Sequence, residues 1–155
     1  MVEDKNKIPD KTRPMNILLA EDNTADVKII LEAFAKAKLK NKVYVTSNGE
    51  EALDFIYHKN KFSDENLFPR PDLIILDIIM PKVDGFVVLE KIKNDPGYSS
   101  IPVIILTCSK EEENTAKSFK GGACAYISKS DDPQEFSRAV EGFDFFWHAI
   151  HRIGG

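Results

Sequence analysis

Short, continuously apolar segments alternate along this chain with segments expected to be helical, and this alternation restricts the folds that it can adopt. The apolar segments are residues 16–20, 43–46, 73–76, 103–106 and 125–127. The helical segments are residues 25–38, 50–58, 86–93 and 111–119 and a last helix capped by Asp131-Asp132-Pro133. Strands that are apolar throughout are typical of a parallel sheet covered by helices on both faces. With right-handed crossovers, this favours an α/β fold with a doubly wound, five-stranded parallel sheet in the order 2-1-3-4-5.

The two ends of the chain lie outside this alternation. Residues 1–14 are charged, contain two prolines and lack periodicity, so we expect a disordered N-terminal tail. Residues 15–151 are expected to form one domain. A C-terminal tail over residues 152–155 is expected to follow it, with no output domain.

Charge and hydrophobicity exclude several classes of protein. The formal net charge is −4, which argues against non-specific nucleic-acid binding because that requires a basic face. No apolar run approaches the roughly 20 residues of a membrane span, and the polar N-terminus does not resemble a signal peptide. We therefore expect a cytoplasmic protein outside the membrane. Cys108 and Cys124 form no motif, and we expect reduced, buried side chains there rather than a disulfide.

Polar side chains follow four of the five apolar segments at the point where each segment ends. They are Glu21 and Asp22 after the first, Asp77 after the third, Thr107 after the fourth and Lys129 after the fifth. Because the carboxyl ends of parallel strands meet at one edge of the sheet, these side chains are expected to share a rim. Any one of them alone is as readily explained as a helix N-cap.

The combination of these residues predicts metal binding and phosphoryl transfer. Three carboxylates close together repel, and one takes up a proton unless a cation offsets them. Mg²⁺ binds carboxylate and carbonyl oxygens together with water and phosphate oxygens. An aspartate beside Mg²⁺ is a nucleophile toward phosphorus, with Lys129 and Thr107 to stabilise the transferred group.

These motifs together resemble the receiver domain of two-component response regulators. The matching residues are Glu21-Asp22, Asp77-x-x-Met80-Pro81-x-x-Asp84-Gly85, Thr107 and Tyr126-x-x-Lys129. The resemblance covers residue 15 to about residue 150 and implies the flavodoxin-like receiver fold. Within the family, the chain is most similar to stand-alone regulators of bacteriophytochrome-type histidine kinases. The segment "EDNTADV", the long loop before the third strand and the aromatic last helix carry that similarity.

The resemblance implies a role for each residue of the acidic set. Asp77 would be the phospho-acceptor, which takes a phosphoryl group from the histidine of a sensor kinase. Asp22 would bind Mg²⁺ directly and Glu21 through water. The backbone carbonyl of Ile79 would complete the protein ligands.

Three further residues would respond to the phosphoryl group. Lys129 would pair with it, Thr107 would swing to hydrogen-bond it, and Tyr126 would follow inward. Such a switch signals by contact with a downstream protein, whose identity the sequence does not reveal. The protein would be no enzyme beyond catalysing its own phosphorylation and dephosphorylation.

Two departures from the family pattern bear on this expectation. Ser130 replaces the proline that usually follows the site lysine. Either the Lys129–Ser130 bond is trans and the loop differs, or surrounding contacts hold it cis, which we favour. Ile79 lies two residues beyond Asp77, where it cannot orient an attacking water, so we expect a long-lived phosphorylated state.

The last helix carries an apolar stripe with Phe146 at its edge and Phe145 on the opposite side. An aromatic side chain on the far face suggests a partner surface, and we expect a homodimer through this helix.

Three other functions compete with this interpretation. An aspartyl phosphohydrolase would carry a second acid at position 79, where this chain has isoleucine. A flavin or nucleotide module would require a phosphate-binding loop after the first strand, where Glu21-Asp22 would repel phosphate. A degenerate receiver would act as a phosphorylation-independent binding module, which the intact acidic set, Thr107 and Lys129 disfavour.

Overall fold

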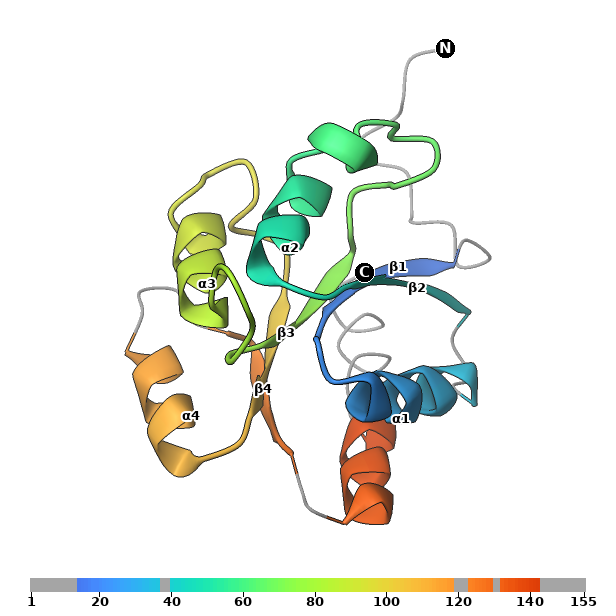
Figure 1. The fold of residues 1–155 in the computed structure, drawn as a ribbon, viewed down its shortest axis with the longest axis vertical. Helices are drawn as coiled ribbons and strands as arrows, with labels where there is room; N and C mark the ends of the chain where they lie inside the picture. Colours follow the sequence, from blue (N-terminus) through green and yellow to red (C-terminus); the bar gives the residue numbers. More distant parts are fainter. Residues whose placement is uncertain (1–13, 37–39, 119–122, 130–131, 143–155) are drawn as a thin grey trace.

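A five-stranded parallel sheet forms the centre of the molecule (Figure 1). The computed structural model describes residues 14–36, 40–118, 123–129 and 132–142. The strands are β1 (Met15–Ala20), β2 (Asn41–Thr46), β3 (Leu73–Asp77), β4 (Val103–Thr107) and β5 (Ala125–Ser128). Their order is β2-β1-β3-β4-β5 with every pair parallel. The predicted α/β fold and strand order are therefore confirmed.

The helices between the strands start where a short polar side chain caps them. They are α1 (Thr24–Ala35), α2 (Gly49–Ile56), α3 (Gly85–Lys93) and α4 (Lys110–Lys117), and residues 133–142 are also helical. The caps are Asn23, Asn48, Asp84 and Ser109, whose side chains each accept a hydrogen bond from a first-turn backbone N–H group. Such caps satisfy donors that have no partner within the helix.

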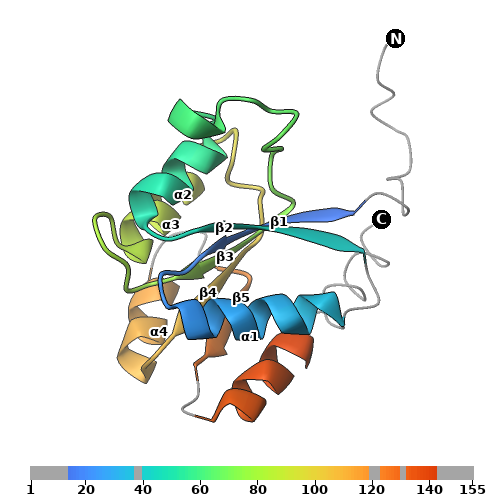
Figure 2. The same cartoon turned by 45° about the vertical axis from the view of Figure 1, so that its right-hand side comes forward.

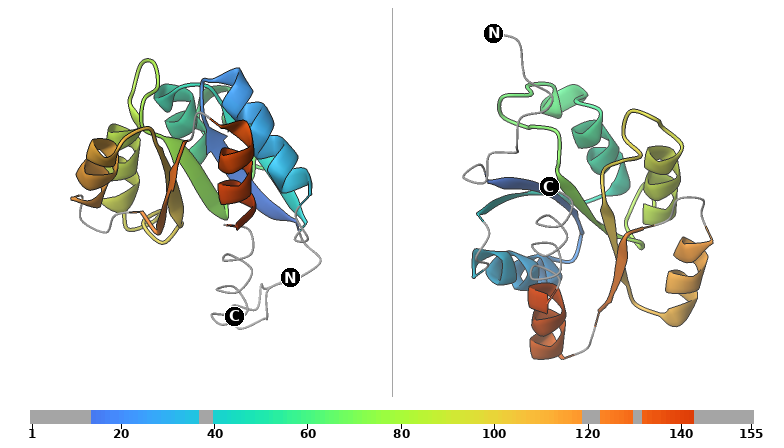
Figure 3. Two further views of the ribbon diagram at one scale, coloured as in Figure 1. Left: turned by 90° about the horizontal axis from the view of Figure 1, so that it is seen from below. Right: turned by 180° about the vertical axis from the view of Figure 1, so that it is seen from behind.

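Two helix layers cover the two faces of the sheet (Figure 2). One layer contains α2, α3 and α4, and the other contains α1 and residues 133–142 (Figure 3). Neighbouring residues of a strand face opposite layers, so Leu18 packs in the first core and Ile17 and Leu19 pack in the second. β2 lies at the edge of the sheet, and Val45 there is 43% exposed. Helices therefore bury both faces of the central strands β1, β3 and β4, as expected, but not those of β2.

The segment from residue 59 to residue 71, which is the long loop before the third strand, is anchored by aromatic side chains. It contains a single 3-10 turn, Asn60–Phe62, and Phe62 is only 7% exposed. The ring of Phe55 lies 5.2 Å from that of Phe62 and 5.9 Å from that of Phe68. The segment leads into β3 at the amino ends of the strands (top of Figure 1). This packing therefore lies far from the rim where the polar side chains gather.

The cysteine prediction was partly wrong. Cys108 and Cys124 are free thiols, but both are exposed. Each follows or precedes a strand rather than lying within one, so neither packs into a core. Among the described residues, no helix combines the length and apolarity that crossing a membrane requires.

Several sequence predictions concern residues outside the described ranges. They are the N-terminal tail up to residue 13, the Lys129–Ser130 bond, Phe145 and Phe146 on the last helix, and the C-terminal tail over residues 152–155.

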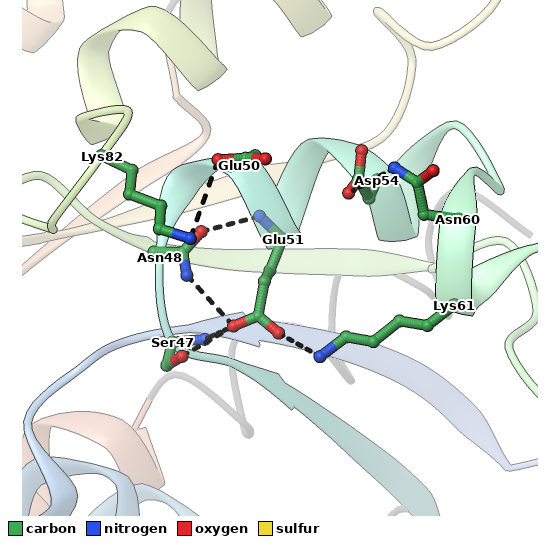
Figure 4. A network of polar contacts seen from close by, with 8 residues as sticks. All are labelled: Ser47, Asn48, Glu50, Glu51, Asp54, Asn60, Lys61 and Lys82. Atoms are coloured by element: carbon green, nitrogen blue, oxygen red, sulfur yellow. Dashed lines mark hydrogen bonds and ion pairs between the residues drawn. The ribbon is translucent and has the colours of Figure 1, made fainter.

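Glu51 connects the start of α2 to the turn before it and to the segment that follows the helix (Figure 4). Its backbone N–H donates to Asn48 Oδ1 at 2.8 Å, and its Oε1 accepts from Ser47 Oγ at 2.7 Å. Its Oε2 pairs with Lys61 Nζ at 2.5 Å. The bonds to Lys61 and Ser47 lower the pKa of Glu51 to about 2. The carboxylate therefore stays charged well below the pH at which it would take up a proton in the unfolded chain.

We expect Glu51→Gln to lower the free energy of unfolding at neutral pH by about 1 kcal/mol. The effect is small because Lys61 is exposed, so solvent screens the ion pair. Because the pKa of Glu51 is lower in the folded state, its contribution is complete above about pH 4.5 and disappears as the pH falls toward about 2. Urea unfolding of both proteins across this range should show the difference shrinking with acidification. Glu50→Gln is the matched control, because Glu50 is 60% exposed and meets Lys82 only at 3.9 Å. A difference that does not change with pH would contradict this assignment.

Candidate functional site

Three carboxylates meet where β1 and β3 end. Glu21 directly follows β1 and Asp77 is the last residue of β3, its neighbour in the sheet. Oxygens from Glu21, Asp22 and Asp77 lie within 4.8 Å of one another. Glu21 is 1% exposed and Asp77 3%, whereas Asp22 is exposed. The three acids therefore share one rim, as the sequence predicted, and the structure shows that two of them are buried and one is open to solvent.

Lys129 supplies the positive charge at this rim. Its Nζ lies 2.6 Å from Glu21 Oε2 and 3.1 Å from Asp77 Oδ2. Its backbone N–H donates to the carbonyl of Thr107 at 2.7 Å, which fixes the residue beside the end of β4. The same Nζ also contacts Asp26 Oδ2 at 3.0 Å. One ammonium group therefore meets three carboxylates.

Asp26 is the residue of this cluster that sequence reasoning missed. It lies in the first turn of α1, where its backbone N–H donates to the capping Asn23 side chain at 3.0 Å. The sequence did carry a signal, because an acid three residues after an N-cap belongs to the first turn and so lies near the strand ends. That signal is equally typical of an acid that only complements the helix dipole.

Burial and neighbouring charges shift the pKa values of Glu21 and Lys129. Burial raises the pKa of Glu21 to about 7, the nearby Asp77 adds to this rise, and Lys129 partly opposes it. For Lys129, burial acts to lower the pKa, but the contacts with Glu21, Asp77 and Asp26 outweigh it and raise the pKa above its ordinary value. The lysine therefore stays charged at all physiological pH values, while Glu21 binds a proton more readily than an exposed glutamate does.

The donors present suit a hard divalent cation. Asp77 Oδ1 is buried and has no hydrogen-bond partner among the described residues, although a buried oxygen without a partner is costly. Glu21 Oε1 accepts from the backbone N–H of Asn23 at 3.0 Å. With Asp22 open to solvent, the cluster offers oxygen ligands only, as Mg²⁺ or Mn²⁺ prefers.

The remaining predicted site residues lie around this cluster. Thr107 ends β4 and is 2% exposed, in register with Ser128 of β5. Tyr126 is half-buried against the core, with Lys117 Nζ 5.2 Å from its ring centre. Ile79 follows β3 in the loop after Asp77, and its side chain is 62% exposed.

Two close backbone approaches hold the loop that follows Asp77. The N–H of Gly85 donates to the carbonyl of Ile78 at 2.7 Å, and a Cβ at Gly85 would lie 2.3 Å from the carbonyl oxygen of Asp77. A Cβ at Gly49, the first residue of α2, would lie 1.9 Å from the carbonyl oxygen of Val83. The loop is therefore clamped between α3 and α2.

Comparison with known proteins agrees with this arrangement. The family model for the response regulator receiver domain matches residues 17–141. The chain belongs to the response regulator receiver family. Among curated relatives of this receiver is response regulator Rcp1 of Synechocystis sp., which is 32% identical over 134 residues, covering 86% of this chain and 89% of Rcp1.

Solved structures of other receivers share the fold. The phosphorylated cyanobacterial phytochrome response regulator RcpA superposes with a TM-score of 0.80 at 34% identity, covering 89% of this chain and 96% of RcpA. The Mn²⁺-bound form of Rcp1 gives a TM-score of 0.78 at 32% identity, covering 86% and 94%. The bacteriophytochrome response regulator RtBRR gives 0.71 at 35% identity, covering 84% and 79%. This receiver is thus close to phytochrome response regulators.

Proposed function

We propose that this receiver accepts a phosphoryl group on Asp77 from a histidine of a sensor kinase, with Mg²⁺ bound by the acidic cluster. The observation that carries the proposal is Asp77 itself. Its carboxylate is buried beside those of Glu21 and Asp22. One carboxylate oxygen contacts the Lys129 ammonium, and the other has no hydrogen-bond partner among the described residues. The Mn²⁺ in Rcp1 and the phosphoryl group in RcpA support both parts of it.

The transfer forms one bond and breaks one. An Asp77 carboxylate oxygen attacks phosphorus, the new P–O bond forms, and the P–N bond breaks with its electron pair leaving on the imidazole. Asp22 and the Ile79 carbonyl would hold Mg²⁺ directly and Glu21 through water, and the ion would offset the charge that gathers on the phosphoryl oxygens. Lys129 already lies 3.1 Å from Asp77 Oδ2, so it is placed to pair with the transferred group.

The transferred phosphoryl group would then change the β4–β5 side of the domain. Thr107 is buried at the end of β4, whose carboxyl end lies beside that of β3. Tyr126 is only half-buried, and we expect it to move inward as Thr107 turns toward the phosphoryl group. A few new hydrogen bonds at the phosphate suffice to bias such a two-state element.

Phosphoryl uptake tests the proposal. Incubation with acetyl phosphate and Mg²⁺ should raise the intact mass by one phosphoryl group, and chelation of the metal beforehand should prevent this. Folded protein that gains no mass under either condition would instead favour a receiver that acts as a phosphorylation-independent binding module.

The partners follow from the relatives. A bacteriophytochrome-type sensor kinase is the proposed donor, because Rcp1, RcpA and RtBRR are similar over most of this chain. The match covers 89% of Rcp1 and 96% of RcpA, so we propose that this receiver signals through contact with a downstream protein. The cytoplasm is its proposed location. A homodimer through Phe145 and Phe146, and the domain limits of residues 15–151, stay predictions from the sequence.

We expect Ile79→Asn to shorten the lifetime of the phosphorylated state by roughly tenfold, because an amide can orient the attacking water and an isoleucine cannot. The side chain of Ile79 is 62% exposed, so the exchange leaves the core intact. Loss of the phosphoryl group is followed by intact mass after removal of the donor. Val87→Asn, at a second apolar side chain that is 46% exposed, is the matched control. An unchanged or slower loss in Ile79→Asn would count against this role.

A further inference from the structure

We propose that Asp26 is a positioning residue that anchors the Lys129 ammonium through the whole phosphorylation cycle. The inference rests on the proposed function and extends it to a carboxylate outside the metal cluster. It begins from the contact between Lys129 Nζ and Asp26 Oδ2 at 3.0 Å.

The three contacts of Lys129 are simultaneous. A lysine ammonium has three N–H donors, and here it meets three carboxylates, at 2.6 Å for Glu21, 3.0 Å for Asp26 and 3.1 Å for Asp77. Asp26 therefore does not draw the ammonium away from Asp77. The side chains of Lys129 and Asp26 are 12% and 23% exposed, so solvent screens their pair less than it screens a surface pair.

Asp26 differs from the other two partners in what phosphorylation does to it. Asp77 loses its carboxylate charge when it forms the acyl phosphate, and Glu21 belongs to the oxygen cluster that suits a divalent cation. Asp26 has no part in that cluster among the described residues. It is thus the partner that keeps its carboxylate charge and lies outside the metal cluster throughout the cycle.

A helix-capping hydrogen bond holds the backbone of Asp26 in place. The capping side chain of Asn23 accepts from the N–H of Asp26 at 3.0 Å, which holds the first turn of α1. Lys129 is held separately by the hydrogen bond from its N–H to Thr107. The Asp26–Lys129 pair therefore joins α1 to the end of β5 across the site.

Asp26→Asn tests the anchor, because it removes the charge and keeps the size. We expect the rate of phosphoryl uptake from acetyl phosphate to fall about tenfold, as for a lost hydrogen bond to a charged group. Mg²⁺ affinity, measured by calorimetry, should change much less than the uptake rate, since Asp26 is not one of the clustered acids that would bind the ion. Asp26→Glu should recover most of the rate. Glu32→Gln, which removes an exposed carboxylate from the same helix, should match the native protein.

A second measurement does not depend on phosphoryl transfer. The NMR order parameter of the Lys129 side chain should drop in Asp26→Asn, with and without Mg²⁺. An unchanged order parameter, or uptake that is unchanged or faster, would overturn the anchor. If the native protein takes up no phosphoryl group, the proposed function fails, and the order parameter still decides whether Asp26 holds Lys129.

Discussion

Asp77→Asn is expected to abolish phosphoryl uptake from acetyl phosphate, with a loss of at least about 100-fold, because an amide oxygen is not a nucleophile toward phosphorus. The fold should persist. The substitution removes one charge from a crowded acidic cluster, and Lys129 keeps its contacts with Glu21 and Asp26. Intact mass after incubation with Mg²⁺ and acetyl phosphate measures the loss, and urea unfolding checks the stability.

Asp84→Asn is the matched control for this experiment. Asp84 belongs to the same loop, is exposed, and caps α3 by accepting from the N–H of Val87 at 3.1 Å. Asparagine caps helices as well as aspartate does, so Asp84→Asn should keep both stability and uptake. Uptake that persists in Asp77→Asn would show that another residue is the acceptor and would refute the site assignment.

Gly49→Ala is expected to destabilise the protein by about 1–3 kcal/mol and to slow phosphoryl uptake. A Cβ at this position would lie 1.9 Å from the carbonyl oxygen of Val83 and 2.6 Å from its carbonyl carbon. Both atoms are backbone, so the start of α2 and the loop after Asp77 must move apart. That loop carries Ile79 and ends at the cap of α3, so its displacement should disturb the site as well as the packing.

Gly142→Ala controls for the general effect of replacing glycine in a helix. A Cβ at Gly142 would meet nothing within 4 Å, so this change should leave stability unchanged or raise it by about 0.4–1 kcal/mol. Urea unfolding and the rate of phosphoryl uptake should both separate the two variants. Equal stabilities would contradict the clamp between α2 and the loop.

Among the described residues, the site combines excess negative charge with one shared cation. The raised pKa of Glu21 and the unpaired oxygen of Asp77 both follow from placing two acids inside the protein where strands end. Such a site is poised to bind a divalent cation and a phosphoryl group, because each relieves a cost of the resting state.

The predicted rim was recoverable from sequence because its positions depend on topology. Unbroken apolar strands separated by helices leave few arrangements, and a parallel sheet places Glu21, Asp77, Thr107 and Lys129 at one edge whatever their rotamers. The aromatic packing of the long loop before β3 was not predicted, and the burial of the two cysteines was wrongly predicted. Phe62 lies in a loop and packs against Phe55, and a contact of this kind leaves no helical or strand periodicity in the sequence. Cys108 lies one residue beyond the buried end of β4.

The amino-acid sequence by itself determined the fold class, the order of the strands and the acids, hydroxyl and lysine that meet at their ends, because hydrophobic period and chain connectivity are local properties. Only the tertiary structure decided that Asp26 shares Lys129 with Glu21 and Asp77, and that Gly49 must lack a side chain beside Val83. Both depend on distances between elements far apart in the chain, which close packing fixes and which no local pattern records.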